Sequence, residues 1–287
     1  MTPSLKNVFD LPTISETIAK YGLGAKKSLG QNFILDLNLT SKIARQGLPF
    51  DQDELILEIG PGPGALTRGI LLNDASKVLA IEKDNRCLDA LAELKAASDD
   101  RLEILEEDAL RVNYEDIQQS NEVKTLKIIA NLPYNISTEL LMNWVEYRPI
   151  ISGLVLMFQK EVALRLCATP QTKSYGRLSV LTQLRFSAKI AFDVPPSAFK
   201  PAPKVTSSIV VLKPKEMYPE GDLWACIKTI TKQAFAQRRK MLRKTMKDIL
   251  PTIEQDLADL GYPTTARAEE ISPQDYVTLA QNVLDLG

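Results

Sequence analysis

Short apolar runs alternate with helical patterns between residues 50 and 160, and this alternation limits the fold more than any other feature of the chain. The runs typical of strands are 55–59, 77–81, 101–105, 126–130 and 154–158, and the helical patterns between them are 65–73, 86–97 and 137–147. Strands that are apolar on both faces and joined by helices form parallel sheets with both faces covered. The sequence therefore predicts a doubly wound α/β sheet, which binds ligands at the carboxyl ends of its strands.

The pattern changes in the last third of the chain. After a short helical stretch at 178–184, two strands are predicted at 189–194 and 207–213, with antiparallel pairing at the sheet edge. Only helical patterns follow, at 222–236, 240–249, 251–261 and 272–284, the last with Ser272 as its N-cap. We therefore predict an α/β domain over residues 1–212 and a second, small all-α domain over residues 213–287.

Composition limits the classes of protein to which the chain can belong. The longest uninterrupted apolar run, residues 154–158, is far shorter than the roughly 20 residues that cross a bilayer, so no membrane segment is expected. The first 22 residues contain Asp10 and Glu16 and no continuous apolar stretch, which argues against a targeting peptide and favours a cytoplasmic location. The three cysteines are isolated in sequence, so neither a disulfide framework nor a metal site is expected.

Charge is distributed unevenly, although the net charge is only −1. Residues 82–122 contain 13 acidic and 5 basic side chains, whereas residues 159–215 contain 10 basic and 2 acidic ones. Residues 225–247 contain 8 basic side chains and no acidic one. A single cluster of this kind is compatible with a solvated helix face. Two basic segments in one chain favour a polyanionic partner, because phosphate contacts supply much of the affinity of such complexes.

A glycine-rich segment, "LEIGPGPGALT", follows the first predicted strand. Its first two glycines and Ala65 satisfy the pattern of dinucleotide-binding loops, and Glu82, at the end of the next strand, is spaced to bind a ribose. The same spacing suits S-adenosyl-L-methionine. The two prolines of the segment remove N–H groups from the turn, which favours this ligand over the phosphate-bearing NAD, with a purely structural turn as the third interpretation. Asp108, past the third strand, is either an acceptor for an adenine amino group or a surface charge.

The segment "ANLPYNIST" follows the fourth predicted strand and brings together an amide, a proline and a tyrosine. Methylation of adenine N6 uses such groups, because the lone pair of the amine is delocalised into the ring. The side-chain oxygen of Asn131 and the carbonyl of Leu132 would accept hydrogen bonds from the two N–H groups of the amine and localise that lone pair. Pro133 stiffens the turn, and Tyr134 offers a face on which an extruded base stacks. The alternative is an ordinary strand-to-helix turn.

This chemistry also agrees with the absence of histidine from the chain. The methylated amine is cationic and strongly acidic, so its proton can leave to water without a dedicated general base. Hydride transfer to a carbonyl, by contrast, usually needs a histidine, lysine or tyrosine acid and has no use for the amide.

Five segments, in this order, resemble the KsgA-type small-subunit rRNA adenine N6,N6-dimethyltransferases: "KKSLGQNFILD", "EIGPGPGALT", "NLPYNIST", "PSAFKPAPKVTSSIV" and "QRRKMLRKTM". The resemblance runs from about residue 26 to the end of the chain. It implies a Rossmann-like class I methyltransferase fold that uses S-adenosyl-L-methionine. It also implies dimethylation of two adjacent adenosines in the 3′-terminal hairpin of 16S rRNA, on a pre-assembled 30S particle during small-subunit biogenesis. A monomer is expected.

The resemblance also implies roles for particular residues. The cofactor positions of the family fall on Asn32, Ile34, Gly60, Gly62, Glu82, Asp108 and Asn131, with isoleucine at 34 where leucine is more usual. The catalytic positions fall on Asn131, Leu132, Pro133 and Tyr134, and Phe199 falls where a second aromatic ring would sandwich the target base. The residues expected to bind RNA are Arg238, Arg239, Lys240, Arg243 and Lys244.

Three other functions stay open at this point. Erm-type dimethylases of 23S rRNA share the catalytic motifs, but we know no Erm counterpart of "AFAQRRKMLRKTM" or "RAEEISPQDYVTLA". A non-catalytic ribosome-assembly or transcription factor on the same fold would be expected to have lost Asn131, Tyr134, Glu82 or the glycine loop, and all of these are present. An NAD-dependent reductase is the third alternative.

Overall fold

The computed structural model describes residues 6–26 and 30–286, so residues 27–29 of the first resemblance motif lie outside the described part. The chain divides into two compact units, one formed by Met1–Lys160 and Lys189–Lys213 and the other by Glu161–Ala188 and Pro214–Gly287. The domain boundary expected after residue 212 stays a prediction, and the compact second unit additionally contains Glu161–Ala188. Within the described residues, no helix is long and apolar enough to cross a membrane.

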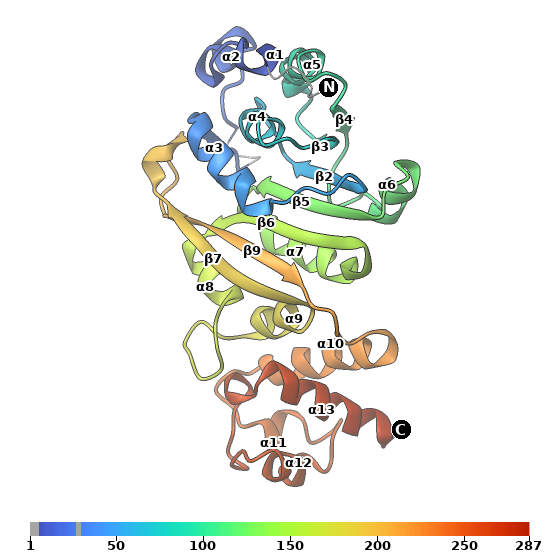
Figure 1. Ribbon diagram of the computed structural model, residues 1–287. Coiled ribbons are helices and arrows are strands. Elements are labelled where there is room, and N and C mark those ends of the chain that lie inside the picture. Colours follow the sequence, from blue (N-terminus) through green and yellow to red (C-terminus); the bar gives the residue numbers. More distant parts are fainter. Residues whose placement is uncertain (1–5, 27–29, 287) are drawn as a thin grey trace. The chain divides into compact units, whose positions relative to one another are not determined.

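A seven-stranded sheet provides the framework of the first unit. Its strands are β2 (Glu54–Ile59), β3 (Val78–Glu82), β4 (Leu102–Glu106), β5 (Thr125–Asn131), β6 (Ile151–Gln159), β7 (Phe186–Val194) and β9 (Ser207–Pro214). They lie in the order β4-β3-β2-β5-β6-β9-β7, with β2 to β6 parallel and β9 antiparallel to β6 (Figure 1). The five predicted parallel strands and the antiparallel pairing at the edge are confirmed.

The central strands are largely apolar and buried. All six residues of β2 are buried, and Ile56, Ala80, Ile129 and Val155, from four different strands, belong to one buried cluster. Burying each large aliphatic side chain contributes about 1.5–3 kcal/mol, so the continuous core favours this order of strands.

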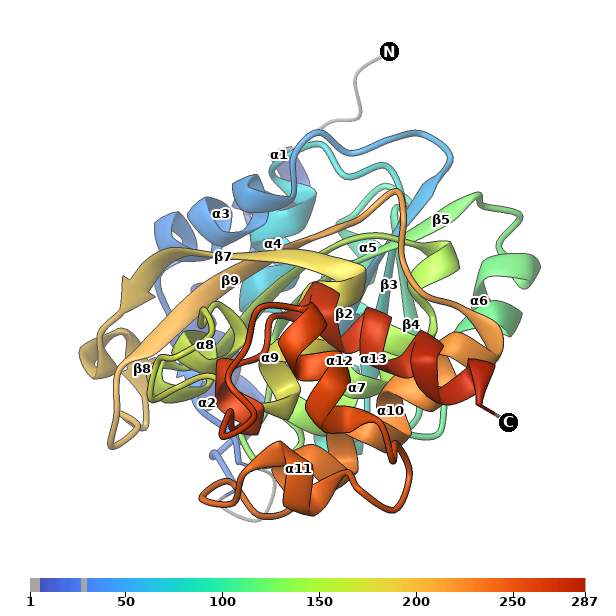
Figure 2. The same cartoon turned by 90° about the horizontal axis from the view of Figure 1, so that it is seen from below.

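The helices of the first unit are α1 (Lys6–Phe9), α2 (Ile14–Lys20), α3 (Leu37–Ala44), α4 (Ala65–Leu71), α5 (Leu88–Ala96), α6 (Tyr114–Ser120) and α7 (Ser137–Glu146). Helices α3 and α4 pack against each other, and Figure 2 shows them side by side. The contact is close because α4 has a glycine there. A Cβ atom on Gly69 would lie 2.6 Å from the carbonyl carbon of Thr40, so any larger residue would push the helices apart.

A separate two-stranded sheet joins distant parts of the first unit. Strand β1 (Phe33–Ile34) pairs antiparallel with β8 (Phe199–Lys200), and Ile34 lies opposite Phe199. The segment that leads into β1 and the segment that leads into β9 are therefore fixed to each other.

The second unit contains all of α8 (Lys160–Leu166) except its first residue, and α9 (Arg177–Arg185), α10 (Gly221–Phe235), α11 (Leu242–Thr245), α12 (Ile253–Asp259) and α13 (Pro273–Asp285). Helices α10 and α13 pack against each other. The predicted N-cap is confirmed, because the side-chain oxygen of Ser272 accepts a hydrogen bond from the N–H of Asp275.

The predicted helix at 240–249 is wrong in its extent, since α11 covers only Leu242–Thr245. Met241 has an extended backbone and forms a β-bridge with Arg267, and the N–H of Leu242 donates to the carbonyl of Ala266. This backbone pairing with a distant segment interrupts the helical pattern. The local propensity is thus overridden by a tertiary contact.

Candidate active site

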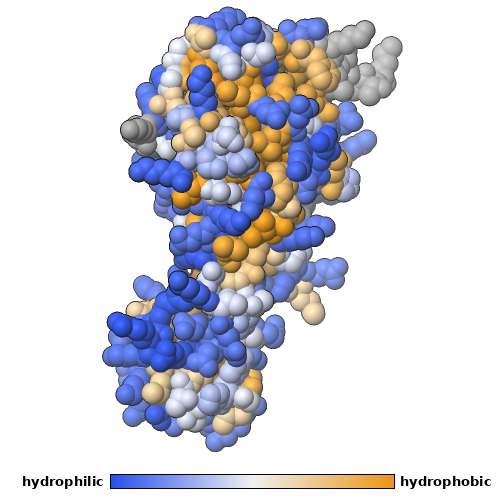
Figure 3. Space-filling model, turned by 90° about the vertical axis from the view of Figure 1, so that its left-hand side faces the viewer, coloured by the Kyte–Doolittle hydropathy of each residue, from blue (hydrophilic) through white to orange (hydrophobic). Residues whose placement is uncertain are grey.

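The strands of the parallel sheet end at a cavity of about 220 Å³ in the first unit. Segments 30–34, 58–63, 81–84, 107–110 and 131–136 line it, and the last four of these lie at the carboxyl ends of β2, β3, β4 and β5. The arrows of β2 and β5 in Figure 1 point towards its left-hand side. Figure 3 shows the molecule from that side, and apolar residues form a patch on the surface of the first unit there. The cavity lies where a doubly wound sheet binds its ligand.

The glycine loop after β2 is held by hydrogen bonds that its N–H groups donate to β3 and within the loop. The N–H groups of Gly60 and Gly64 donate to the carbonyls of Ile81 and Pro61, and the N–H of Gly62 donates to Glu82. Gly62 has a φ of +54°, and a Cβ atom there would lie 3.0 Å from the ring of Phe33, so a larger residue would fit poorly. All three glycine N–H groups thus donate within the protein. The loop therefore suits a ligand without a pyrophosphate better than a dinucleotide.

Glu82 is 5% exposed and lines the cavity. Its Oε2 accepts a hydrogen bond from the N–H of Gly62 at 2.9 Å, and its Oε1 accepts one from the N–H of Asp84 at 2.7 Å. Burial raises the pKa of this carboxyl, and the two backbone hydrogen bonds oppose that shift. Each oxygen keeps a lone pair for a hydroxyl donor, so Glu82 fits the expected role as a ribose ligand.

Asp108 lines the same cavity from the end of β4. Its Oδ2 lies 2.7 Å from Nζ of Lys83, and its Oδ1 accepts a hydrogen bond from the N–H of Leu110. The hydrogen bond from Lys83 lowers the pKa of Asp108, so this side chain is an anionic acceptor beside the cavity.

Glu58 is a cavity residue that the sequence analysis did not single out. It lies on β2 two residues before the glycine loop and is 1% exposed. Burial, and after it the charge of Glu82, raises the pKa of Glu58 to about 8. Among the described residues no hydrogen-bond partner reaches its Oε2. A carboxyl inside the apolar run 55–59 was the available signal.

Asn131 is the last residue of β5 and lines the cavity. Its Nδ2 donates a hydrogen bond to the main-chain carbonyl of Asn32 at 3.2 Å. A carbonyl can only accept, so this contact assigns the two ends of the amide and turns Oδ1 away from Asn32. The amide therefore presents an acceptor, as the predicted chemistry needs.

The rest of the "NLPY" segment forms a tight turn into α7. The carbonyl of Pro133 accepts a hydrogen bond from the N–H of Ile136, and the side chain of Leu132 is buried. The hydroxyl of Tyr134 lies 2.6 Å from the hydroxyl of Ser207 on β9, a residue that the sequence analysis did not consider. The turn thus fixes both the backbone and the aromatic ring.

The structure brings most of the predicted site residues together. The lining residues include Asn32, Ile34, Gly60, Gly62, Glu82, Asp108, Asn131, Leu132, Pro133 and Tyr134. Phe199 is not among them. It is 6% exposed and belongs to the buried apolar cluster of the first unit. Its role as a second stacking ring stays a prediction.

The predicted RNA-binding cations of the second unit have different environments. Nη2 of Arg238 donates to the carbonyl of Tyr175 at 2.9 Å and lies 3.4 Å from the carboxylate of Glu269, while Arg243 lies 3.7 Å from the carboxylate of Glu254. These two arginines therefore contribute to the fold of the unit. The exposed predicted cations are Arg238, Arg239, Lys240 and Lys244. Arg238 also lines a hollow with the cationic side chains of Arg165, Lys173 and Arg177.

A parallel sheet with one antiparallel strand pair at its edge, a glycine loop after β2 and a carboxylate at the end of β3 define a class I methyltransferase fold. A dimethyladenosine transferase from Plasmodium falciparum has this fold, with a TM-score of 0.70 and 25% identity over 86% of this chain and 95% of that one. The 23S rRNA methyltransferase ErmE shares the fold, with a TM-score of 0.69 and 24% identity over 88% of this chain and 99% of that one.

Sequence similarity extends over nearly the whole chain. The family described as "Ribosomal RNA adenine dimethylase" matches residues 22–284, and this chain belongs to it. A ribosomal RNA small subunit methyltransferase A of Ruegeria sp. (strain TM1040) is 48% identical over 279 residues, 96% of this chain and 97% of the relative. The protein of that name from Agrobacterium fabrum (strain C58 / ATCC 33970) is 48% identical over 94% of this chain and 97% of the relative.

Proposed function

We propose that this protein transfers methyl groups from S-adenosyl-L-methionine to N6 of two adjacent adenosines in the 3′-terminal hairpin of 16S rRNA, within a small-subunit particle. Membership of the rRNA adenine dimethylase family and the two small-subunit relatives at 48% identity support this function. The observation that carries it is the orientation of the Asn131 amide, whose donor end is bound to the carbonyl of Asn32, so that the other end of the amide is its acceptor oxygen.

The residues around the cavity fit the proposed cofactor. S-adenosyl-L-methionine, when bound, supplies an electrophilic methyl group on a sulfonium. The two oxygens of Glu82 are oriented by backbone N–H groups and would accept hydrogen bonds from the ribose hydroxyls. Asp108 would accept a hydrogen bond from the adenine amino group of the cofactor. Asn32 and Ile34 would contact its methionine end. The three glycine N–H groups of the loop after β2 already donate to acceptors within the protein, so this loop does not need a phosphate ligand.

The residues of the turn after β5 would activate the substrate amine. Oδ1 of Asn131 and the carbonyl oxygen of Leu132 would each accept a hydrogen bond from adenine N6, which localises the nitrogen lone pair for attack on the methyl carbon. Transfer breaks the bond between the sulfonium sulfur and the methyl carbon and leaves a neutral thioether and a cationic amine. The amine then loses a proton to water, so the chain needs no histidine. Tyr134, held through its hydroxyl, would stack on the extruded base.

The second unit would hold the RNA through its exposed cations. Arg239, Lys240 and Lys244 are exposed and sit in a segment without acidic residues. Lysine and arginine at such positions bind phosphates, and the affinity of such contacts falls steeply as salt rises. These residues would supply affinity, while the turn after β5 selects the base.

Labelling distinguishes this function from the alternatives. The purified protein is incubated with tritiated S-adenosyl-L-methionine and unmodified small-subunit particles, and in parallel with large-subunit RNA, before nucleoside analysis. We expect label in N6,N6-dimethyladenosine of 16S rRNA. Label only in the large-subunit RNA would instead support an Erm-type enzyme. No label, with cofactor binding intact, would support a non-catalytic assembly factor.

A further inference from the structure

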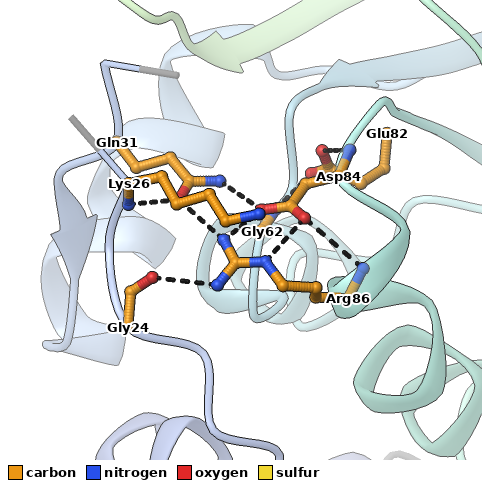
Figure 4. Close-up of polar contacts among 7 residues, drawn as sticks. All are labelled: Gly24, Lys26, Gln31, Gly62, Glu82, Asp84 and Arg86. Atoms are coloured by element: carbon orange, nitrogen blue, oxygen red, sulfur yellow. Dashed lines mark hydrogen bonds and ion pairs between the residues drawn. The ribbon is translucent and has the colours of Figure 1, made fainter. Parts of the chain in front are cut away.

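A network of side chains connects the segment before β1 to the turn after β3 (Figure 4). Asp84 lies at its centre and is 5% exposed. Its carboxylate accepts hydrogen bonds from Nε of Arg86 at 2.9 Å and from Nη2 of Arg86 at 2.5 Å. Nε2 of Gln31, 53 residues away in sequence, donates to the same carboxylate at 2.9 Å. A two-point contact between arginine and carboxylate has a defined geometry, so it fixes the acceptor that Gln31 uses.

The same side chains also hold the backbone of the segment before β1. Nη1 of Arg86 donates to the carbonyl of Gly24 at 3.2 Å, and Oε1 of Gln31 accepts a hydrogen bond from the N–H of Lys26 at 2.9 Å. The amide of Gln31 therefore uses both of its ends. The hydrogen bonds from Arg86 hold the pKa of Asp84 at about 2, so the carboxylate is ionised at neutral pH.

The network reaches the cavity at two points. The N–H of Asp84 donates to Oε1 of Glu82, which is the proposed ribose ligand. Asn32 directly follows Gln31, and its carbonyl accepts the hydrogen bond from Nδ2 of Asn131. Asp84 holds the side chain of Gln31, and the next residue, Asn32, provides the carbonyl that orients the proposed catalytic amide.

We propose that Gln31, Asp84 and Arg86 position the carbonyl of Asn32, and through it the acceptor oxygen of Asn131. The inference rests on the proposed function of Asn131. The side-chain amide of an asparagine can rotate, and its hydrogen bonds decide which end faces a ligand. If the carbonyl of Asn32 moves out of reach, the amide can turn its Nδ2 towards the substrate amine, and two donors then oppose each other. Gln31 is therefore a positioning residue for methyl transfer.

The first test compares Gln31→Ala with Gln118→Ala, a matched control. Nε2 of Gln118 donates to the carbonyl of Lys124, and Gln118 does not line the cavity. In single-turnover transfer to small-subunit particles, Gln31→Ala should lower the rate about tenfold, with the dissociation constant of S-adenosyl-L-methionine changed less than about threefold. Gln118→Ala should leave both unchanged. A wild-type rate in Gln31→Ala, or a loss that only follows a lower melting temperature, would overturn the inference.

A double-mutant cycle asks whether Gln31 acts through Asn131. In an Asn131→Ala background, Gln31→Ala should change the residual rate less than about twofold, because the side chain that it positions is gone. A tenfold loss in that background would show that Gln31 acts by another route. Arg86→Gln removes a different member of the network. It should likewise lower the transfer rate in the wild-type background and change it little in the Asn131→Ala background.

A crystal structure of Gln31→Ala tests the positioning step without any activity. The contact between Nδ2 of Asn131 and the Asn32 carbonyl should be lost or lengthened beyond 3.5 Å, the limit for a hydrogen bond. An unchanged contact would overturn the inference, even if wild type methylates the particle. A wild-type enzyme that transfers no methyl group would contradict the proposed function instead.

Discussion

The hydroxyl oxygen of Tyr134 lies 2.6 Å from the hydroxyl oxygen of Ser207, so the ring proposed to stack on the base is held from β9. Ser207 is fully buried, and burial raises the pKa of Tyr134, so the phenol stays neutral. A hydrogen bond at the hydroxyl leaves the faces of the ring unused. The contact therefore fixes the orientation of the ring and keeps a face for a base.

Removing the ring of Tyr134 should weaken RNA recognition more than removing its hydrogen bond. We expect Tyr134→Ala to raise the KM for small-subunit particles about 10- to 100-fold, because stacking contributes about 1–3 kcal/mol per base. Tyr134→Phe and Ser207→Ala keep the ring and should raise the KM less than about fivefold. Steady-state kinetics measures these values. Equal losses in Tyr134→Phe and Tyr134→Ala would mean that the hydroxyl, and not the ring face, matters.

Cofactor binding should raise the melting temperature through Glu82. S-adenosyl-L-methionine at 100 times its dissociation constant should stabilise the protein by about 2.7 kcal/mol, and NAD at the same concentration should not. Glu82→Ala should abolish this shift. Glu103→Ala, which removes an exposed carboxylate of β4, should keep it. Differential scanning calorimetry provides the measurement, and protection by NAD would contradict the account.

Glu58 should make the stability of the cofactor-free protein fall as pH rises. Its pKa is about 8 in the folded state and 4.5 without the fold, so the native carboxyl keeps its proton where the unfolded one has lost it. The stabilisation from this group is complete below pH 4.5 and is lost as pH rises towards 8, by at most about 1.4 kcal/mol per pH unit. Glu58→Gln should show a flatter dependence in thermal unfolding between pH 5 and 8. Parallel curves for the two proteins would rule out a neutral native Glu58.

The exposed and the structural cations of the second unit should respond differently to charge reversal. Arg239→Glu combined with Lys240→Glu should weaken particle binding and reduce the salt slope by about 2, with an unchanged melting temperature. Arg238→Glu should also lower the melting temperature, because Arg238 bonds the carbonyl of Tyr175 and pairs with Glu269.

The control for this reversal is a double variant of two surface lysines in the first unit that pair with Glu103 and Asp53, Lys95→Glu with Lys124→Glu. It applies the same change of charge outside the second unit and should leave the affinity for the particle within about twofold. Equal weakening by both double variants would mean that net charge, and not this surface, determines binding.

The sequence contained most of the information on the sheet, because its central strands are mostly buried. β2 and β5 were predictable from their apolar runs, and the turn after β5 from its residue types alone. The helix predicted at 240–249 failed because the N–H of Leu242 bonds a carbonyl 24 residues further on. Local pattern does not report such a contact.

The site was predictable where its residues sit next to a strand end. The ten predicted residues that line the cavity end or follow β2, β3, β4 or β5 or belong to the segment around β1. Ser207 and Asp84 were missed because their roles come from contacts with side chains 73 and 53 residues away. Glu58 was missed because an acid within a buried strand shows its unusual pKa only once the packing around it is known.

The rate of a single turnover by Asn131→Ala tests the central claim, that the Asn131 oxygen accepts a hydrogen bond from the substrate amine. The wild type and the variant are compared with saturating S-adenosyl-L-methionine and unmodified small-subunit particles, with the cofactor dissociation constant measured separately. We expect the transfer rate to fall by a factor of about 100 or more, as when a preorganised transition-state contact is removed, while the fold is retained. A variant that folds, binds the cofactor and transfers methyl groups at a near-normal rate would contradict the account.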